Sequence, residues 1–135
     1  MEGRAIVADV NVPDDLRYTK DHEWVRVEGD RVRIGITDYA QDVLGDVVYV
    51  QVPTLGLPVA AGASFSEVES TKSVSDIYAP ITGEVVEANQ DLADAPERLN
   101  DDPYGDGWIC ALSVADAGEL DGLLDAATYR TLTES

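Results

Sequence analysis

Residues 62–89, GASFSEVESTKSVSDIYAPITGEVVEAN, contain the pattern that decides the fold of this chain. Residues 63–69 have the composition of a strand, a short polar segment follows at 70–73, and apolar sequence returns at 74–78. Two strand-like runs joined by a short polar connection predict a β-hairpin. We therefore expect Lys72, one of only two lysines in the chain, at the tip of a hairpin.

Further short strands are predicted on both sides of this hairpin. The candidate segments share β-branched residues and are bounded by Gly, Pro, Asn or Asp, and they lie at residues 23–27, 32–37, 46–52, 81–87 and 108–114. Many short strands separated by Gly- and Pro-containing turns favour a β-sandwich or a small barrel over a helical fold.

Helical patterns are few. A two-turn helix is expected at 38–45, with Asp38 as its N-cap, Gln41 completing a capping box and Gly45 at its end. Leucines and alanines at helical spacing predict one amphipathic helix over residues 116–132. A single helical turn is expected near residues 96–99, and the first 16 residues show no sustained period.

The charge of the chain excludes several functions. The 135 residues include 27 acidic and 9 basic side chains, a formal net charge of −18. Such a surface does not neutralise phosphates, so we expect no nucleic-acid partner and no binding to an anionic membrane. No apolar run reaches the length of a membrane span, and residues 1–8 resemble neither a signal nor a transit peptide, which predicts a cytoplasmic protein. Cys110, the only cysteine, can form no intramolecular disulfide.

Groups able to perform chemistry are scarce. His22 is the only histidine, and the chain has no G-x-S-x-G elbow and no glycine-rich phosphate loop. The acidic residues Asp101, Asp102 and Asp106 do not have the spacing of a calcium loop, so no metal is assigned. A carrier or binding module is therefore favoured over an enzyme, and no residue is assigned a catalytic role.

The surroundings of Lys72 suit a covalent carrier. Its neighbours Ser70, Thr71 and Ser73 are small and leave the ammonium clear of the surface. A hairpin tip fixes the base of the side chain and leaves its stem mobile, as a cofactor on a swinging arm requires. From spacing alone, an ordinary solvated turn lysine is the more frequent alternative.

A family resemblance favours the carrier lysine over the ordinary turn lysine. The chain resembles the glycine cleavage system H-protein family over about residues 16–134. The matching segments are YT at 18–19 with HEW at 22–24, GITDYAQ at 35–41, LGDVVYV at 44–50, ESTKS at 69–73 with YAP at 78–80, and NDDPYGDGW at 100–108. Lys72 falls on the lysine that carries lipoate in this family.

The resemblance implies a fold and a site. The fold is a mainly β, lipoyl/biotinyl-type barrel-sandwich hybrid, a flattened barrel with a short helix near 38–44 and a C-terminal helix. It implies an extension over residues 1–16, a lipoyl-binding domain over 17–115 with its core at about 31–113, and a C-terminal helix over 116–135 packed on the same domain. Lipoate would be attached covalently at Lys72, and the residues of the motif around it are Glu69, Ser70, Thr71, Ser73 and Asp76.

The resemblance also implies a role and partners. The lipoyl-lysine arm would take the aminomethyl group of glycine from glycine decarboxylase (P protein) to aminomethyltransferase (T protein), and dihydrolipoamide dehydrogenase (L protein) would reoxidise it. A surface cleft would shelter the loaded arm, and lipoyl-attaching enzymes would be further partners. Two alternatives stay open: an H-like protein that relays lipoate to other enzymes, and an acidic interaction module whose Lys72 is never modified.

Overall fold

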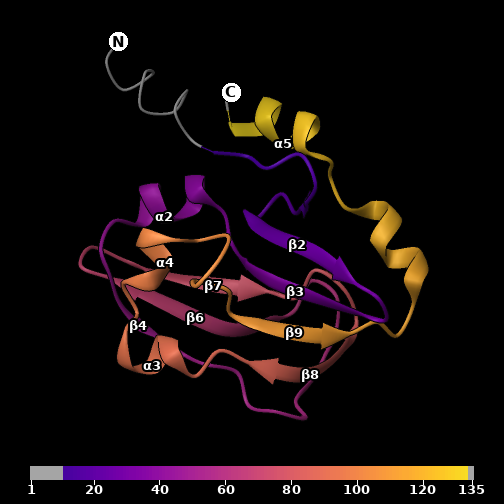
Figure 1. Cartoon of the computed structure of the whole chain (residues 1–135), viewed down its shortest axis with the longest axis horizontal. Coiled ribbons are helices and arrows are strands. Elements are labelled where there is room, and N and C mark those ends of the chain that lie inside the picture. Colours follow the sequence, from indigo (N-terminus) through magenta and orange to yellow (C-terminus); the bar gives the residue numbers. More distant parts are fainter. Residues whose placement is uncertain (1–10, 134–135) are drawn as a thin grey trace.

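The computed structural model describes residues 11–133 and contains two antiparallel sheets (Figure 1). The larger sheet has the order β1-β2-β3-β9-β8-β5, with β1 (Arg17–Tyr18), β2 (Glu23–Glu28), β3 (Arg31–Ile36), β9 (Cys110–Ser113), β8 (Gly83–Ala88) and β5 (Pro58–Val59). The smaller has the order β4-β6-β7, with β4 (Val47–Val50), β6 (Ser64–Ser70) and β7 (Val74–Tyr78). The expected fold class is confirmed: the molecule is mainly β and flattened, with two sheets rather than a strictly closed barrel.

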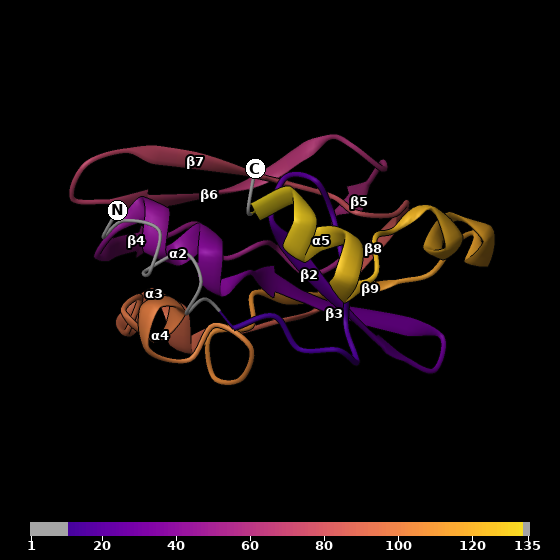
Figure 2. The same ribbon diagram turned by 90° about the horizontal axis from the view of Figure 1, so that it is seen from above.

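The main core lies between the two sheets. Figure 2 shows the β6–β7 hairpin in one layer and β2, β3, β8 and β9 in the other. Alternate residues of each strand point inward, so Val68 and Ile77 of the small sheet join Ile34 and Leu112 of the large sheet in one buried cluster. These residues are at most 2% exposed, which fixes the root of the β6–β7 hairpin rigidly in the sandwich.

A second buried cluster covers the outer side of the large sheet. Its members come from both ends of the described chain: Val12, Leu16, Tyr18, Trp24, Ala126 and Tyr129. The rings of Tyr18 and Tyr129 stack with centroids 4.6 Å apart, and the Trp24 indole donates to the carbonyl oxygen of Pro103. Residues 12 and 16 therefore pack into the fold, whereas the rest of the expected extension, residues 1–10, lies outside the described residues. The proposed division at residues 16 and 115 stays a prediction.

The expected helix at 38–45 is confirmed as α2 (Asp38–Leu44), but its N-cap is Thr37 and not Asp38. Thr37 has extended backbone angles, and its hydroxyl accepts from the amide of Ala40. The Asp38 carboxylate instead accepts from the side chain of Gln41, so no reciprocal capping box forms. Gly45 ends the helix as predicted, with a φ of +85° that favours glycine.

The expected continuous helix over 116–132 is wrong. The segment contains a 3₁₀ helix, η1 (Ala117–Gly122), and a separate helix, α5 (Ala126–Thr133). Between them Leu124 is extended, because its amide and carbonyl groups both bond to the backbone of Tyr18 at 2.8 Å. The single helical turn expected near 96–99 is found two residues later as α4 (Arg98–Asp101), and a second short helix, α3 (Asp91–Asp94), precedes it.

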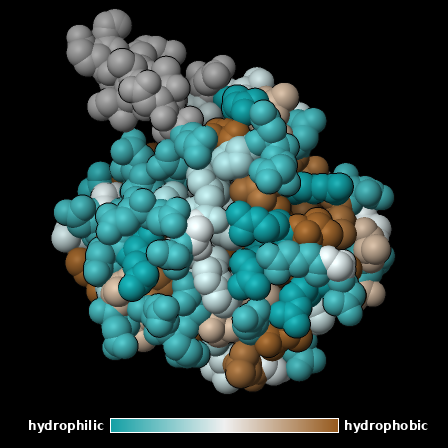
Figure 3. Space-filling model, viewed as in Figure 1, coloured by the Kyte–Doolittle hydropathy of each residue, from teal (hydrophilic) through white to brown (hydrophobic). Residues whose placement is uncertain are grey.

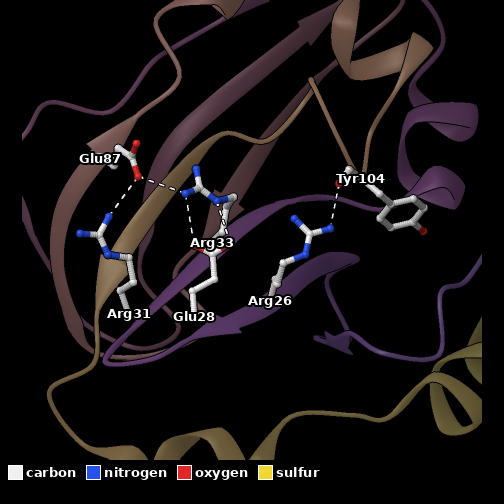
Figure 4. Close-up of polar contacts among 6 residues, drawn as sticks. All are labelled: Arg26, Glu28, Arg31, Arg33, Glu87 and Tyr104. Atoms are coloured by element: carbon white, nitrogen blue, oxygen red, sulfur yellow. Dashed lines mark hydrogen bonds and ion pairs between the residues drawn. The ribbon is translucent and has the colours of Figure 1, made fainter.

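Three arginines lie on the outer face of the large sheet (Figure 4). Arg33 bonds to Glu28 of β2 and Glu87 of β8, and Arg31 also reaches Glu87. Arg33 lies over the ring of Trp108 at 4.2 Å, and Arg26 donates to the carbonyl oxygen of Tyr104. These contacts join strands distant in sequence and leave this face with mixed charge, on a surface that is mostly hydrophilic (Figure 3).

Candidate functional site

One hydroxyl group shapes the turn that presents Lys72. The Ser70 Oγ accepts from the backbone amides of Lys72 at 3.2 Å and Ser73 at 3.1 Å, and the amide of Ser70 donates to the carbonyl oxygen of Ser73. The amide of Thr71 donates to the carbonyl oxygen of Asp46, which ties the turn to the segment before β4. The backbone under Lys72 is thus fixed by side-chain and main-chain bonds.

The Lys72 side chain itself is exposed and lies towards the end of α2. A Cβ built on Gly45 would lie 3.3 Å from Cε of Lys72, so the stem passes close over Gly45. Among the described residues, no carboxylate forms an ion pair with its ammonium, although Glu69 and Asp76 lie on the same hairpin. An exposed amine without a fixed partner fits a group joined to it by an amide bond.

The other residues of the motif have different positions. Ser70 and Thr71 hold the turn, and Ser73 is exposed beside Lys72. Glu69 pairs in register with Tyr49 of β4 on one side and with Val74 of β7 on the other. Tyr49 and Val74 are 50% and 59% exposed, so Glu69 stands between two exposed apolar side chains. Asp76 is exposed and pairs with Glu67, two residue pairs further from the tip than Glu69 and Val74.

A cavity of about 310 Å³ lies beside the hairpin, between α2 and β7. Its apolar lining includes Ile36, Tyr39 and Val43, and residues 73–77 of the hairpin, Asp76 among them, also line it. Asp21 and His22, from the segment before β2, line it as well. The surface cleft that the resemblance implies therefore has a counterpart here, next to Lys72.

His22 occupies an unusual backbone conformation. Its φ is +72°, and within residues 11–133 it is the only non-glycine residue with a positive φ. Its Nδ1 lies 2.8 Å from the hydroxyl of Tyr129, and its ring is 4.8 Å from that of Tyr39. Burial lowers the pKa of His22 below its usual 6.5, with Asp21 opposing the shift, so the imidazole is neutral at pH 7. The hydrogen bond to Tyr129 and the neutral ring indicate a structural role for His22.

Glu23 is a buried carboxyl group that directly follows Asp21 and His22, two residues that line the cavity. It is 1% exposed, and its two oxygens accept from the Thr19 hydroxyl at 2.6 Å and from the Tyr78 amide at 3.0 Å. Burial raises its pKa to about 7, although both hydrogen bonds oppose the shift. The bond to Tyr78 links β2 to the far end of β7.

This shifted pKa predicts a pH dependence of stability. Because the pKa of Glu23 is about 7 in the folded chain and 4.5 in the unfolded one, the folded state holds an extra proton between these values. The contribution of Glu23 to the free energy of unfolding is therefore fully present below pH 4.5. As the pH rises from 4.5 to about 7, the free energy of unfolding falls by about 3 kcal/mol. Glu23→Gln cannot titrate and should remove this loss.

The measurement is the free energy of unfolding in denaturant at pH 5 and pH 8 for both proteins. Subtracting the two pH dependences cancels the other titrating groups, including His22, whose lowered pKa acts in the opposite direction. Equal pH dependences for the two proteins would show that Glu23 stays ionised in the folded state.

The sequence alone gave no sign of several residues at this site. Tyr39 and Tyr129 contact His22 from α2 and α5; Tyr39 lies within the GITDYAQ segment, but no motif singled out either side chain. Among residues 11–133, no group of three or more His, Cys, Asp or Glu side chains could hold a metal ion. Within that same range, no helix is long and apolar enough to cross a membrane. Cys110 is buried, and burial raises the pKa of its thiol to about 12.

A flattened β fold with an exposed lysine at the tip of a rigid hairpin defines a domain of the lipoyl/biotinyl class. Comparison with known proteins narrows this class. A sequence model of the family described as glycine cleavage H-protein matches residues 16–135. This chain belongs to the glycine cleavage H-protein family.

Individual relatives are similar along nearly their whole length. The glycine cleavage system H protein of Nocardia farcinica is 63% identical over 123 residues, covering 87% of this chain and 93% of that protein. The H protein of Thermus thermophilus is 55% identical over 126 residues, covering 93% and 98%. The crystal structure of the H protein from Mycobacterium marinum matches with a TM-score of 0.82 at 45% identity, covering 89% of this chain and 97% of that one.

Proposed function

We propose that this chain is the lipoyl-bearing carrier of a glycine cleavage system and that Lys72 is the lipoylated residue. The observation that carries the proposal is the exposed Lys72 on a turn fixed by Ser70, beside a cavity large enough to take part of an arm. Family membership agrees with it. When bound, lipoate supplies a cyclic disulfide that can accept both a one-carbon fragment and electrons and can then be reoxidised.

The chain's own residues position and shelter the arm. The sandwich core holds the root of the hairpin, Ser70 sets the turn, and the cavity between α2 and β7 offers a recess that an arm would fill, which would displace water from around it. No residue of the chain is proposed to perform catalysis, which makes it a non-catalytic component of a multienzyme system. We keep its cytoplasmic location as part of the proposal.

The proposed partners are glycine decarboxylase, aminomethyltransferase, dihydrolipoamide dehydrogenase and a lipoyl-attaching enzyme. The test is reconstitution: the lipoylated chain is added to the first three enzymes, and carbon dioxide release from labelled glycine is measured. Release that depends on the lipoylated chain supports the proposal. Failure of the lipoylated chain to support release, with a known H protein active in the same mixture, would contradict it and favour a lipoate relay instead.

The acidic surface predicts how the carrier meets glycine decarboxylase. If the net charge of −18 steers association, raising salt from low to high concentration should slow association by about tenfold and change dissociation less. Glu67→Gln with Glu69→Gln, made in lipoylated protein, should reproduce part of the loss because both carboxylates flank the Lys72 hairpin. Stopped-flow mixing at several salt concentrations measures both rates.

A matched control removes the same charge elsewhere. The control is the double variant Glu84→Gln with Asp121→Asn. Glu84 lies on β8 and Asp121 on η1, and both side chains are exposed. In Figure 2, η1 is at the end of the molecule away from the hairpin tip. This pair should affect association less than the hairpin pair. Association rates that do not respond to salt would mean that the acidic surface serves solubility alone.

A further inference from the structure

A single buried hydroxyl group joins the C-terminal helix α5 to the cavity beside Lys72. The Tyr129 Oη lies 2.6 Å from Oγ1 of Thr37 and 2.8 Å from Nδ1 of His22. Thr37 is the N-cap of α2, which forms one wall of the cavity, and His22 lines the same cavity. Tyr129 therefore contacts both elements, although it lies 107 residues from His22 and does not line the cavity itself.

The hydrogens of this chain of bonds can be assigned from burial. Thr37 Oγ1 already accepts from the Ala40 amide, and Thr37 is 0% exposed. Within the described residues, Tyr129 Oη is the only acceptor for the hydrogen of the Thr37 hydroxyl. If Tyr129 donated to Thr37 instead, the buried threonine hydrogen would be left without an acceptor, which is unfavourable.

This assignment fixes the state of the imidazole. With Thr37 donating to Tyr129, the Tyr129 hydrogen goes to Nδ1 of His22, which must be the unprotonated nitrogen. The neutral ring then carries its proton on Nε2. The left-handed backbone of His22 is not one that a histidine adopts freely, so contacts elsewhere must hold this residue in place.

We propose that Tyr129 is a positioning residue of the carrier cavity, which fixes the His22 imidazole in the cavity wall as a neutral Nε2–H donor. The inference rests on the proposed function in one respect only, that the cavity receives the Lys72 arm. An aminomethyl group is cationic at neutral pH, and a neutral ring does not repel it. Asp21 and Asp76 also line this cavity, so with a neutral His22 the net charge of its lining is negative.

The first experiment uses the unmodified protein and does not depend on lipoate. Because His22 is the only histidine, both imidazole ¹⁵N resonances belong to it, and only Nδ1 and Nε2 have to be told apart. Tyr129→Phe keeps the ring stacked on Tyr18 but removes both hydrogen bonds. We expect the Nδ1 resonance to move to the position of a nitrogen without a donor, and the contacts between the His22 and Tyr39 rings to weaken.

Tyr104→Phe is the matched control. The Tyr104 hydroxyl also makes two bonds at the start of α2, accepting from the Asp38 amide and donating to the carbonyl oxygen of Asn11, but it does not touch His22. It should leave the imidazole resonances unchanged. An Nδ1 resonance that is the same in wild type and Tyr129→Phe would overturn the proposal.

The second experiment uses lipoylated protein loaded with the aminomethyl group, without partner enzymes. The lifetime of the adduct in solution should fall by about two- to tenfold in Tyr129→Phe, as expected if the released imidazole no longer makes one neutral hydrogen bond to the arm, and should be unaffected in Tyr104→Phe. Altered resonances with an unchanged lifetime would overturn the positioning role and leave Tyr129 a structural residue. If Lys72 accepts no lipoate at all, the proposed function fails, whereas the resonance experiment still decides the state of His22.

Discussion

Lys72→Arg is expected to abolish lipoylation and carrier activity and to leave the fold intact. The guanidinium keeps the positive charge but does not form the lipoyl amide. Lys72 is exposed, and its side chain forms no hydrogen bond with other residues of the 11–133 range. The free energy of unfolding should therefore change by no more than about 0.5 kcal/mol. Incubation with a lipoylating enzyme followed by intact mass measurement checks the first part, and denaturant unfolding checks the second.

Lys20→Arg is the control for this prediction. Lys20 is the other lysine, exposed in the turn between β1 and β2 and not part of the turn that presents Lys72. This variant should be lipoylated like the wild type. A large loss of stability in Lys72→Arg, with Lys20→Arg unaffected, would instead make Lys72 a structural residue.

Gly83→Ala is expected to destabilise the chain by about 3 kcal/mol or more. Gly83 begins β8, and a Cβ at this position would lie only 1.9 Å from the backbone carbonyl oxygen of Ser113 in β9. The clash is with backbone, so relief requires that β8 and β9 separate, although their pairing holds the middle of the large sheet. Thermal or denaturant unfolding of the purified variant measures the loss.

Gly122→Ala provides the comparison. Gly122 ends η1, has no atom within 4 Å of a built Cβ, and does not have a positive φ. Alanine there should change stability by no more than about 0.5 kcal/mol. If both variants unfolded at the same denaturant concentration as the wild type, the close approach of β8 to β9 would be wrong.

Local patterns in the sequence predicted the parts of the fold that local interactions determine. Strand composition at 63–69 and the polar turn at 70–73 were sufficient to place Lys72 at a hairpin tip, because strand propensity and turn chemistry act over a few residues. The helix α2 was found for the same reason. Its cap was displaced by one residue because Thr37 and Asp38 are both good N-caps, and the backbone conformation at Thr37 decides between them.

Long-range contacts determine what the sequence did not predict. Leucines at helical spacing over 116–132 suggested one helix, yet the backbone of Leu124 pairs with Tyr18, more than 100 residues away, and is extended. In the sequence Gly83 looks like an ordinary turn glycine. The structure shows instead that the backbone of Ser113 leaves no room for a Cβ at this position. The cavity and the contact between Tyr129 and His22 likewise exist only once α2, β7 and α5 have packed.

The site of lipoate attachment is the central claim, and its most direct test is the mass of the protein isolated from its native host. The account predicts the addition of one lipoyl group, located by peptide mapping on the segment that contains Ser70 to Val74. Modification mapped to Lys20, or an unmodified chain in a host that lipoylates its other carriers, would contradict it.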